Sequence, residues 1–165
     1  LGAAGRIDEA ITAFQALLTD RTRVLGSDHP DTLTTRNNLA CQLGDIGRID
    51  EAITAFQALL TDRTRILGSD HPDTLTTRNN LALMLSAAGR AEEAITASQA
   101  SLTDELRILG SDHPDTLTTR HNLALMLGAA GRAEEAITAS QALLVDQLRI
   151  LGPDHPHTLT TRNNL

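Results

Sequence analysis

The chain has 165 residues, and its 14 basic against 21 acidic residues leave a net charge of −7. Every basic residue is an arginine, and the arginines are spread along the chain, which excludes the clustered positive surface that nucleic-acid binding requires. The single cysteine, Cys41, excludes an internal disulfide and a cysteine-based zinc cage, and no apolar run approaches the roughly 18 residues that span a bilayer. We expect a soluble, cytoplasmic protein that binds neither nucleic acid nor membrane.

A block of 42 residues recurs along the chain. Residues 47–88 are identical to residues 89–130 at 34 of 42 positions. The pair His-Pro recurs at residues 29–30, 71–72, 113–114 and 155–156, and Gly-Arg recurs at 5–6, 47–48, 89–90 and 131–132. A fixed period of this size indicates a solenoid, in which each unit buries its apolar face against its neighbours.

Each block predicts two helices. In chain order, residues 6–25 predict a long second helix (helix B), and complete hairpins of a helix A and a helix B follow. In the block 69–110, helix A is predicted from Pro72 to Ala87, with Asp70 capping its first amides and Gly89 in a left-handed C-terminal cap. Helix B follows for about 19 residues and ends at Gly110, since its apolar residues recur at i, i+3, i+4 and i+7. The short connection predicts an antiparallel hairpin.

The hairpin pattern resembles the tetratricopeptide repeat. Leu39, Ala40, Leu43, Gly47, Ala52, Phe56 and Leu59 have the spacing of that consensus, and the same frame recurs from Leu81 and from Leu123. The 42-residue length and the loop Leu-Gly-x-Asp-His-Pro-Asp-Thr-Leu are similar to the repeats of kinesin light chains. The resemblance implies an all-α, right-handed superhelical solenoid of antiparallel helix A/helix B hairpins. Residues 1–165 would form one array of about four repeats, cut mid-repeat at both ends from a longer chain.

The consensus aromatic of helix B survives only as Phe14 and Phe56, and serine replaces it at positions 98 and 140. Ser101 likewise stands where the other blocks have leucine. A buried phenylalanine traded for serine would cost roughly 3–5 kcal/mol before any relaxation. We therefore expect the block around Ser98 to be the least stable of the array, unless these serines face solvent on a loosely packed convex side.

The residues give no support to an enzyme, a metal site or a cofactor. The repeated loop histidines are 42 residues apart, too far for shared zinc ligation, and are explained as local hydrogen-bonding groups. Only His155 and His157 are close in sequence, which leaves room for a weak adventitious nickel or zinc site. Cys41 stands where other blocks have leucine and is interpreted as an apolar substitute. The chain has no phosphate-binding glycine loop and no nucleophile elbow.

The resemblance implies that the A helices line a concave groove. The residues expected to bind a peptide there are Thr34, Asn37, Asn38, Cys41, Thr76, Arg78, Asn79, Asn80, Leu83, Thr118, Arg120, His121, Asn122, Leu125 and Asn163. Asparagine is a poor helix former, so paired mid-helix asparagines need a reason. Their amides suit the backbone of an extended peptide, or one of each pair bonds to the neighbouring helix and stabilises stacking.

An arginine row lies beside these amides at positions 36, 78, 120 and 162. The arginines could hold an acidic ligand, or could pair with acids at the starts of neighbouring B helices, such as Glu51 and Glu93. The sequence therefore predicts a non-enzymatic scaffold that binds a protein or an extended, possibly acidic, peptide. Two alternatives stay open: a sensor array of a larger signalling NTPase, and a module that self-associates head to tail through its incomplete ends.

Overall fold

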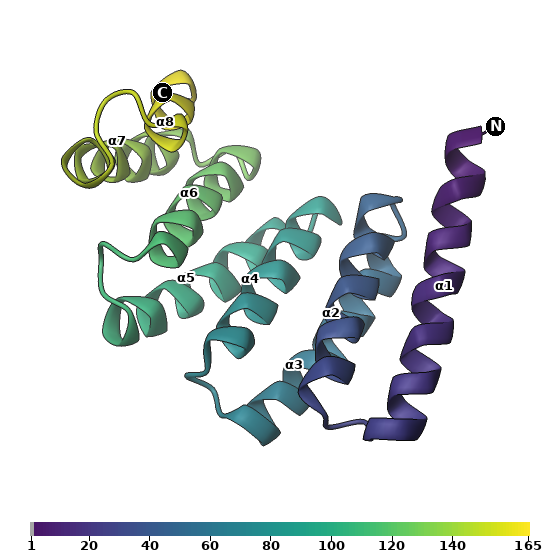
Figure 1. Ribbon diagram of the computed structural model, residues 1–165. Coiled ribbons are helices and arrows are strands. Elements are labelled where there is room, and N and C mark those ends of the chain that lie inside the picture. Colours follow the sequence, from purple (N-terminus) through teal and green to yellow (C-terminus); the bar gives the residue numbers. More distant parts are fainter. Residues whose placement is uncertain (1) are drawn as a thin grey trace. The chain divides into compact units, whose positions relative to one another are not determined.

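The computed structural model describes residues 2–165, and in the first helix it describes the side chains of Glu9 and of residues 11–25. Over this range the chain forms eight helices and no strand (Figure 1). The helices are α1 (Gly2–Leu25), α2 (Pro30–Asp45), α3 (Ile49–Leu67), α4 (Pro72–Ala87), α5 (Ala91–Ile108), α6 (Pro114–Ala129), α7 (Ala133–Ile150) and α8 (Pro156–Asn163). They fall into two compact units, Leu1–Ala88 with α1–α4 and Gly89–Leu165 with α5–α8.

The A helices are α2, α4, α6 and α8, and their sequence explains where they begin and end. The helix predicted from Pro72 to Ala87 is confirmed as α4, and Gly89 beyond its end has a φ of 74°, where glycine is favoured. The predicted cap was wrong, however. His71, not Asp70, is the N-cap residue, and its Nδ1 accepts a bond of 3.1 Å from the Asp73 amide.

Histidine caps begin the other A helices in the same way. The Nδ1 atoms of His29, His113 and His155 each accept from the amide two residues later, at 3.2 Å. The proline between cap and amide sits in the first helical turn, where its missing N–H has no helical partner to lose. The interpretation of the loop histidines as local hydrogen-bonding groups is confirmed.

The first unit is held by side chains at the consensus packing positions. α2 packs on α1 and α3, and α3 packs on α4, so each helix lies beside its chain neighbour (Figure 1). Phe56, Leu59 and Ala52 of α3 are fully buried, and Leu33 of α2 is 1% exposed. The helix predicted at residues 6–25 begins earlier, at Gly2. The local sequence does not explain this extension, because the identical stretch Leu-Gly-Ala-Ala-Gly-Arg at residues 127–132 ends α6.

The second unit keeps the same framework with smaller side chains in α5. Ser98 is 2% exposed and Ser101 is fully buried, whereas Leu143 of α7 is buried at the position equivalent to Ser101. Ser140 is also buried, at 9%. The alternative that these serines face solvent was therefore wrong. Burial of a small polar side chain forfeits the apolar area that a leucine or phenylalanine would contribute.

Candidate ligand-binding site

The helix A face of the first unit is accessible. Thr34 and Thr76 are exposed, and Leu83 is 37% exposed although it is a large apolar residue. Asn37 and Asn79 are half-buried. The Thr76 hydroxyl donates to the Pro72 carbonyl at 2.9 Å, so its hydrogen is used within the helix while its lone pairs stay available.

One asparagine of the second row, Asn80, bonds to the neighbouring A helix. Asn80 Nδ2 of α4 donates to Asn37 Oδ1 of α2 at 3.5 Å and lies 3.9 Å from Cys41 Sγ. This contact is of the kind expected if one asparagine of each pair bonds to the neighbouring helix and stabilises the stacking of the repeats. Asn38, in the same row, is exposed. Burial, together with the nearby Asp45 carboxylate, raises the pKa of the Cys41 thiol, which argues against a thiolate nucleophile.

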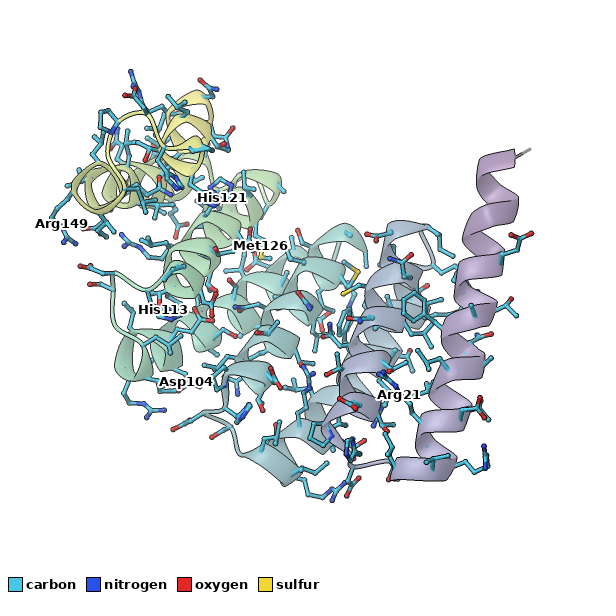
Figure 2. The ribbon with its side chains drawn as sticks, viewed as in Figure 1. Arg21, Asp104, His113, His121, Met126 and Arg149 are labelled. Atoms are coloured by element: carbon cyan, nitrogen blue, oxygen red, sulfur yellow. The ribbon has the colours of Figure 1, made fainter. Side chains whose placement is uncertain are left out.

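In the second unit, Thr118 is exposed and Leu125 is 49% exposed, while His121 and Asn122 are half-buried. His121 replaces the asparagine of the other blocks and extends from α6 on its α8 side (Figure 2). Asn163, at the same period position in α8, is exposed. The residues predicted for the groove are thus half-buried or exposed on the A helices of each unit.

Two of the arginines beside these amides, Arg36 and Arg120, form ion pairs within the protein. Arg36 Nη1 lies 2.7 Å from Asp62 Oδ2, and Arg120 Nη1 lies 2.7 Å from Asp146 Oδ2. Their acidic partners lie in the second half of the following helix B and not at its start. Glu51 at the start of α3 pairs instead with Arg48. The guanidinium groups of Arg36 and Arg120 lower the pKa values of the Asp62 and Asp146 carboxyls.

These ion pairs extend to the inter-repeat loops. Arg149 donates two bonds to the Asp112 carboxylate, at 3.0 and 2.7 Å, and lies 3.5 Å from Asp146. These bonds lower the pKa of Asp112 to about 2. In the first unit, Arg65 binds Asp28 in the same bidentate way. Arg65 and Arg149 therefore hold their B helices against the inter-repeat loops through charge-assisted hydrogen bonds.

The second unit contains a cavity of about 530 Å³ where three elements meet. It lies between α6, the end of α7 and the start of α8, on the side that carries the predicted binding residues Thr118, His121 and Asn122. Its lining residues are Asp112, Pro114, Leu117, Thr118, His121, Asn122, Gln147, Ile150, Leu151, His155 and His157. A smaller hollow of about 290 Å³ lies on the other side of His121 and includes Leu125.

The site has no constellation for metal or enzyme chemistry in the part of the chain that the structure describes. No group of three or more His, Cys, Asp or Glu side chains there could hold a metal ion. The rings of His155 and His157 lie 5.3 Å apart, centroid to centroid, but they form only a pair. His155 Nδ1 is already used to cap α8.

Sequence reasoning placed Thr118, His121 and Asn122 on one face but missed the other walls of the cavity. Leu117, Gln147 and Ile150 come from the buried sides of their helices, and their meeting point follows only from the packing of α7 against α6 and α8. One signal was available in the sequence. Histidine replaces the asparagine of the other blocks at position 121 and their aspartate at position 157, and these two positions are 36 residues apart.

The helical hairpins and their 42-residue period define an all-α repeat solenoid. The tetratricopeptide repeat profile matches residues 1–57, 42–103 and 77–144, and the chain belongs to this family. It is similar to the solved structure of nearly identical repeats from a kinesin light chain-like protein of Podosopora anserina (TM-score 0.83, 26% identity, 99% of this chain and 77% of that one). A single-substitution variant of that protein matches equally well, with a TM-score of 0.85, 26% identity and the same coverage of both chains.

The fold is shared more widely. BtubC from P. vanneervenii superposes with a TM-score of 0.78 at 20% identity, over 92% of this chain and 60% of that one. No curated protein matches the sequence. Tetratricopeptide repeats generally act as non-enzymatic scaffolds for protein interaction. Among the described residues, no helix has the length and apolarity needed to cross a membrane.

Proposed function

We propose that this chain is a scaffold that binds an extended peptide along the helix A faces of its repeats. The observation that carries the proposal is the set of half-buried amides on the helix A faces of each unit, Asn37 and Asn79 in the first and Asn122 in the second. The Asn79 side-chain oxygen is buried and the Asn37 oxygen accepts from Asn80, so these two residues would meet a ligand mainly through their N–H groups. Amide groups that solvent reaches can pair with a peptide backbone of any sequence. The exposed Leu83 and Leu125 supply apolar contacts beside these amides.

The charges of the described residues indicate which kind of peptide the site would prefer. Arg36 and Arg120 are neutralised by Asp62 and Asp146, so the helix A face is less positive than its arginine content suggests. Affinity should therefore come from amide pairing and apolar contact, with acidic residues of the ligand as a secondary preference. We also place this activity in the cytoplasm, which suits the free thiol of Cys41.

A peptide array tests the proposal. Binding to the wild-type chain should be lost or weakened at least about tenfold when Asn79 and Asn80 are both replaced by alanine, because two mid-groove amides then disappear. The matched control replaces Thr54 and Thr61, exposed residues of α3, by alanine. Undiminished peptide binding by the asparagine variant would refute amide recognition in the groove.

Head-to-tail association of two copies is a second candidate. Leu17 of α1 is 40% exposed, whereas its equivalent Leu59 is fully buried. Leu159 of α8 is 42% exposed, whereas its equivalent Leu117 is 5% exposed. In a chain of these 165 residues, α8 of one copy could therefore pack on α1 of the next as α2 packs on α3. Sedimentation that stays strictly monomeric at millimolar concentration would exclude it.

A further inference from the structure

The cavity of the second unit carries two residues that set it apart from the other repeats. His121 stands where Asn37, Asn79 and Asn163 stand, and both it and His157 line this one cavity. The position of His157 is Asp in the three preceding blocks, at residues 31, 73 and 115. One change adds an imidazole, and the other replaces a carboxylate by an imidazole. Together with the capping His155, they place three imidazoles around one opening.

The three imidazoles differ in the hydrogen bonds open to them. His155 Nδ1 accepts from the His157 amide at 3.2 Å, so Nε2 is the ring nitrogen that remains to meet a ligand. The ring of His157 stacks beside it, 5.3 Å away and tilted by 31°. Burial, and secondarily the nearby His157, lowers the pKa of His121. Burial in the cavity thus disfavours the protonated form of the His121 side chain.

The charged side chains around these rings do not balance the positive charge of a protonated imidazole. The only carboxylate among the residues that line the cavity is Asp112, and it is bound twice by Arg149. Asp146 of α7 is likewise engaged, by Arg120 of α6. Asp154 precedes α8 and Arg162 lies near its end, and neither lines the cavity. A protonated imidazole here therefore lacks an unengaged carboxylate partner within the lining.

The remaining walls of the cavity are mainly apolar, and Gln147 of helix B lies among them. Leu117 forms a buried wall, with Ile150 and Leu151 beside it. In the first unit the position of Gln147 is held by Arg63, whose guanidinium crosses to the next helix A at 2.9 Å from a carbonyl and 2.7 Å from a hydroxyl. The shorter Gln147 is 2% exposed, and its side-chain oxygen is buried without a hydrogen-bond partner. The site thus joins apolar walls to imidazole donors.

We infer that this cavity, lined by His121, His155 and His157, binds a carboxylate carried on an apolar group, and binds it more tightly as pH falls. The carboxylate supplies the missing counter-charge, and its apolar group covers Leu117 and Ile150. Because the ligand favours the imidazolium form, binding takes up protons, and affinity can rise by up to about tenfold per pH unit for each proton taken up. Where the carboxylate belongs to a peptide, this inference rests on the proposed function.

Hexanoate is the probe, and its neutral isostere hexanamide is the control ligand. Histidine Hε1 resonances are followed by NMR at pH 5.5 and 7.5 with each ligand. Hexanoate should bind about tenfold more tightly at pH 5.5 and should shift the His121 titration to higher pH. Hexanamide should show no pH dependence. Equal hexanoate affinity at the two pH values, or an unmoved His121 titration, would overturn the inference.

The repeats supply variants that already fold elsewhere in the chain. His121→Asn and His157→Asp each install the residue of the other blocks, and each should abolish the pH dependence, the second also adding a repelling carboxylate. His29→Asn, in the first unit, should leave it unchanged, and far-ultraviolet circular dichroism checks the fold of each variant. Retained pH dependence in both cavity variants would refute the site.

A peptide arm separates this inference from the proposed function. A library of hexapeptides ending in leucine is compared with the same library bearing C-terminal amides. If peptides bind through the asparagines but hexanoate binds equally at both pH values or not at all, the groove proposal survives and the cavity inference fails. If hexanoate binds as expected but no peptide does, the cavity takes small carboxylates and the peptide scaffold proposal fails.

Discussion

The guanidinium of Arg63 donates to the hydroxyl of Thr77 at 2.7 Å inside the first unit, where Arg63 is only 4% exposed. The same nitrogen donates to the Asp73 carbonyl at 2.9 Å, so a helix B side chain ties α3 to the first turns of α4. Arg21 makes the equivalent bonds from α1 to Asp31 and Thr35. At that period position the second unit has Glu105 and Gln147, both buried.

The Arg63 bonds lead to the first prediction. Arg63→Ala should destabilise the chain by about 2–4 kcal/mol, because a buried hydroxyl and a carbonyl lose a charged donor and a cavity remains. Arg63→Met should cost clearly less, because it keeps the volume and removes a buried charge, whose burial lowers the pKa of Arg63. Urea unfolding of the two variants measures the difference. Equal losses would contradict this account.

The arginine–aspartate pairs predict a loss of stability in acid. The bonds from Arg149 lower the folded-state pKa of Asp112 to about 2, and Arg36 and Arg120 lower those of Asp62 and Asp146. Each lowered pKa gives stability that is fully present above the ordinary aspartate pKa of about 3.9 and is lost as pH falls through the folded value. The free energy of unfolding should therefore decline between about pH 5 and pH 2.

Asp112→Asn provides the test of that pH dependence. The variant cannot titrate at this position, so its stability should fall less steeply over the same pH range than that of the wild-type chain. Because the pair is exposed, the change should shrink as salt is added. Parallel pH curves for the two proteins would show that the pair contributes nothing.

A buried serine in α5 predicts that a leucine there stabilises the chain. The Ser101 hydroxyl is fully buried without a hydrogen-bond partner, and Leu59 and Leu143 fill the equivalent positions without exposure. Ser101→Leu should raise the free energy of unfolding by about 1–3 kcal/mol, through apolar burial and removal of an unpaired hydroxyl. Thr103→Leu, on the exposed side of the same helix, is the control and should change stability by under about 0.5 kcal/mol.

Amide exchange tests the same weakness without a mutation. α5 buries Ser98 and Ser101 where α3 buries Phe56 and Leu59, so it contributes less apolar area to its packing. The amides of residues 91–108 should exchange earlier than those of residues 49–67, because local opening follows local burial. Equal protection of the two helices would contradict this prediction.

The sequence predicted the helices far better than it predicted the partners of their side chains. The limits of α4 follow from Pro72 and Gly89, whose effects on the backbone are local. The partner of Arg36 was missed because Asp62 lies 26 residues away, near enough only once α2 and α3 pack together. The cavity was missed for the same reason, since its walls include Leu117 and Gln147 from facing helices.

The choice between His71 and Asp70 as helix cap shows a finer limit. Aspartate is the commoner N-cap residue, so the N-cap preferences favoured Asp70 over His71. The structure instead directs His71 Nδ1 at the Asp73 amide, with an extended N-cap backbone (φ −69°, ψ 138°). The counterparts of Asp70 in two other blocks, Asp28 and Asp112, are bound by the helix B arginines Arg65 and Arg149. Each pair is 37 residues apart in the sequence, so no local pattern predicts it.

The histidine caps give the last prediction. Replacing His71 by alanine removes the acceptor for the Asp73 amide and should destabilise the chain by about 0.5–2 kcal/mol, the usual range for loss of an N-cap. His71→Asn should recover most of that loss, because its side-chain oxygen can accept an amide near the helix start. Thermal unfolding of both variants is compared with that of Thr61→Ala, an exposed mid-helix control. If the alanine variant is as stable as the asparagine variant, His71 contributes through its packing in the loop and not through the cap.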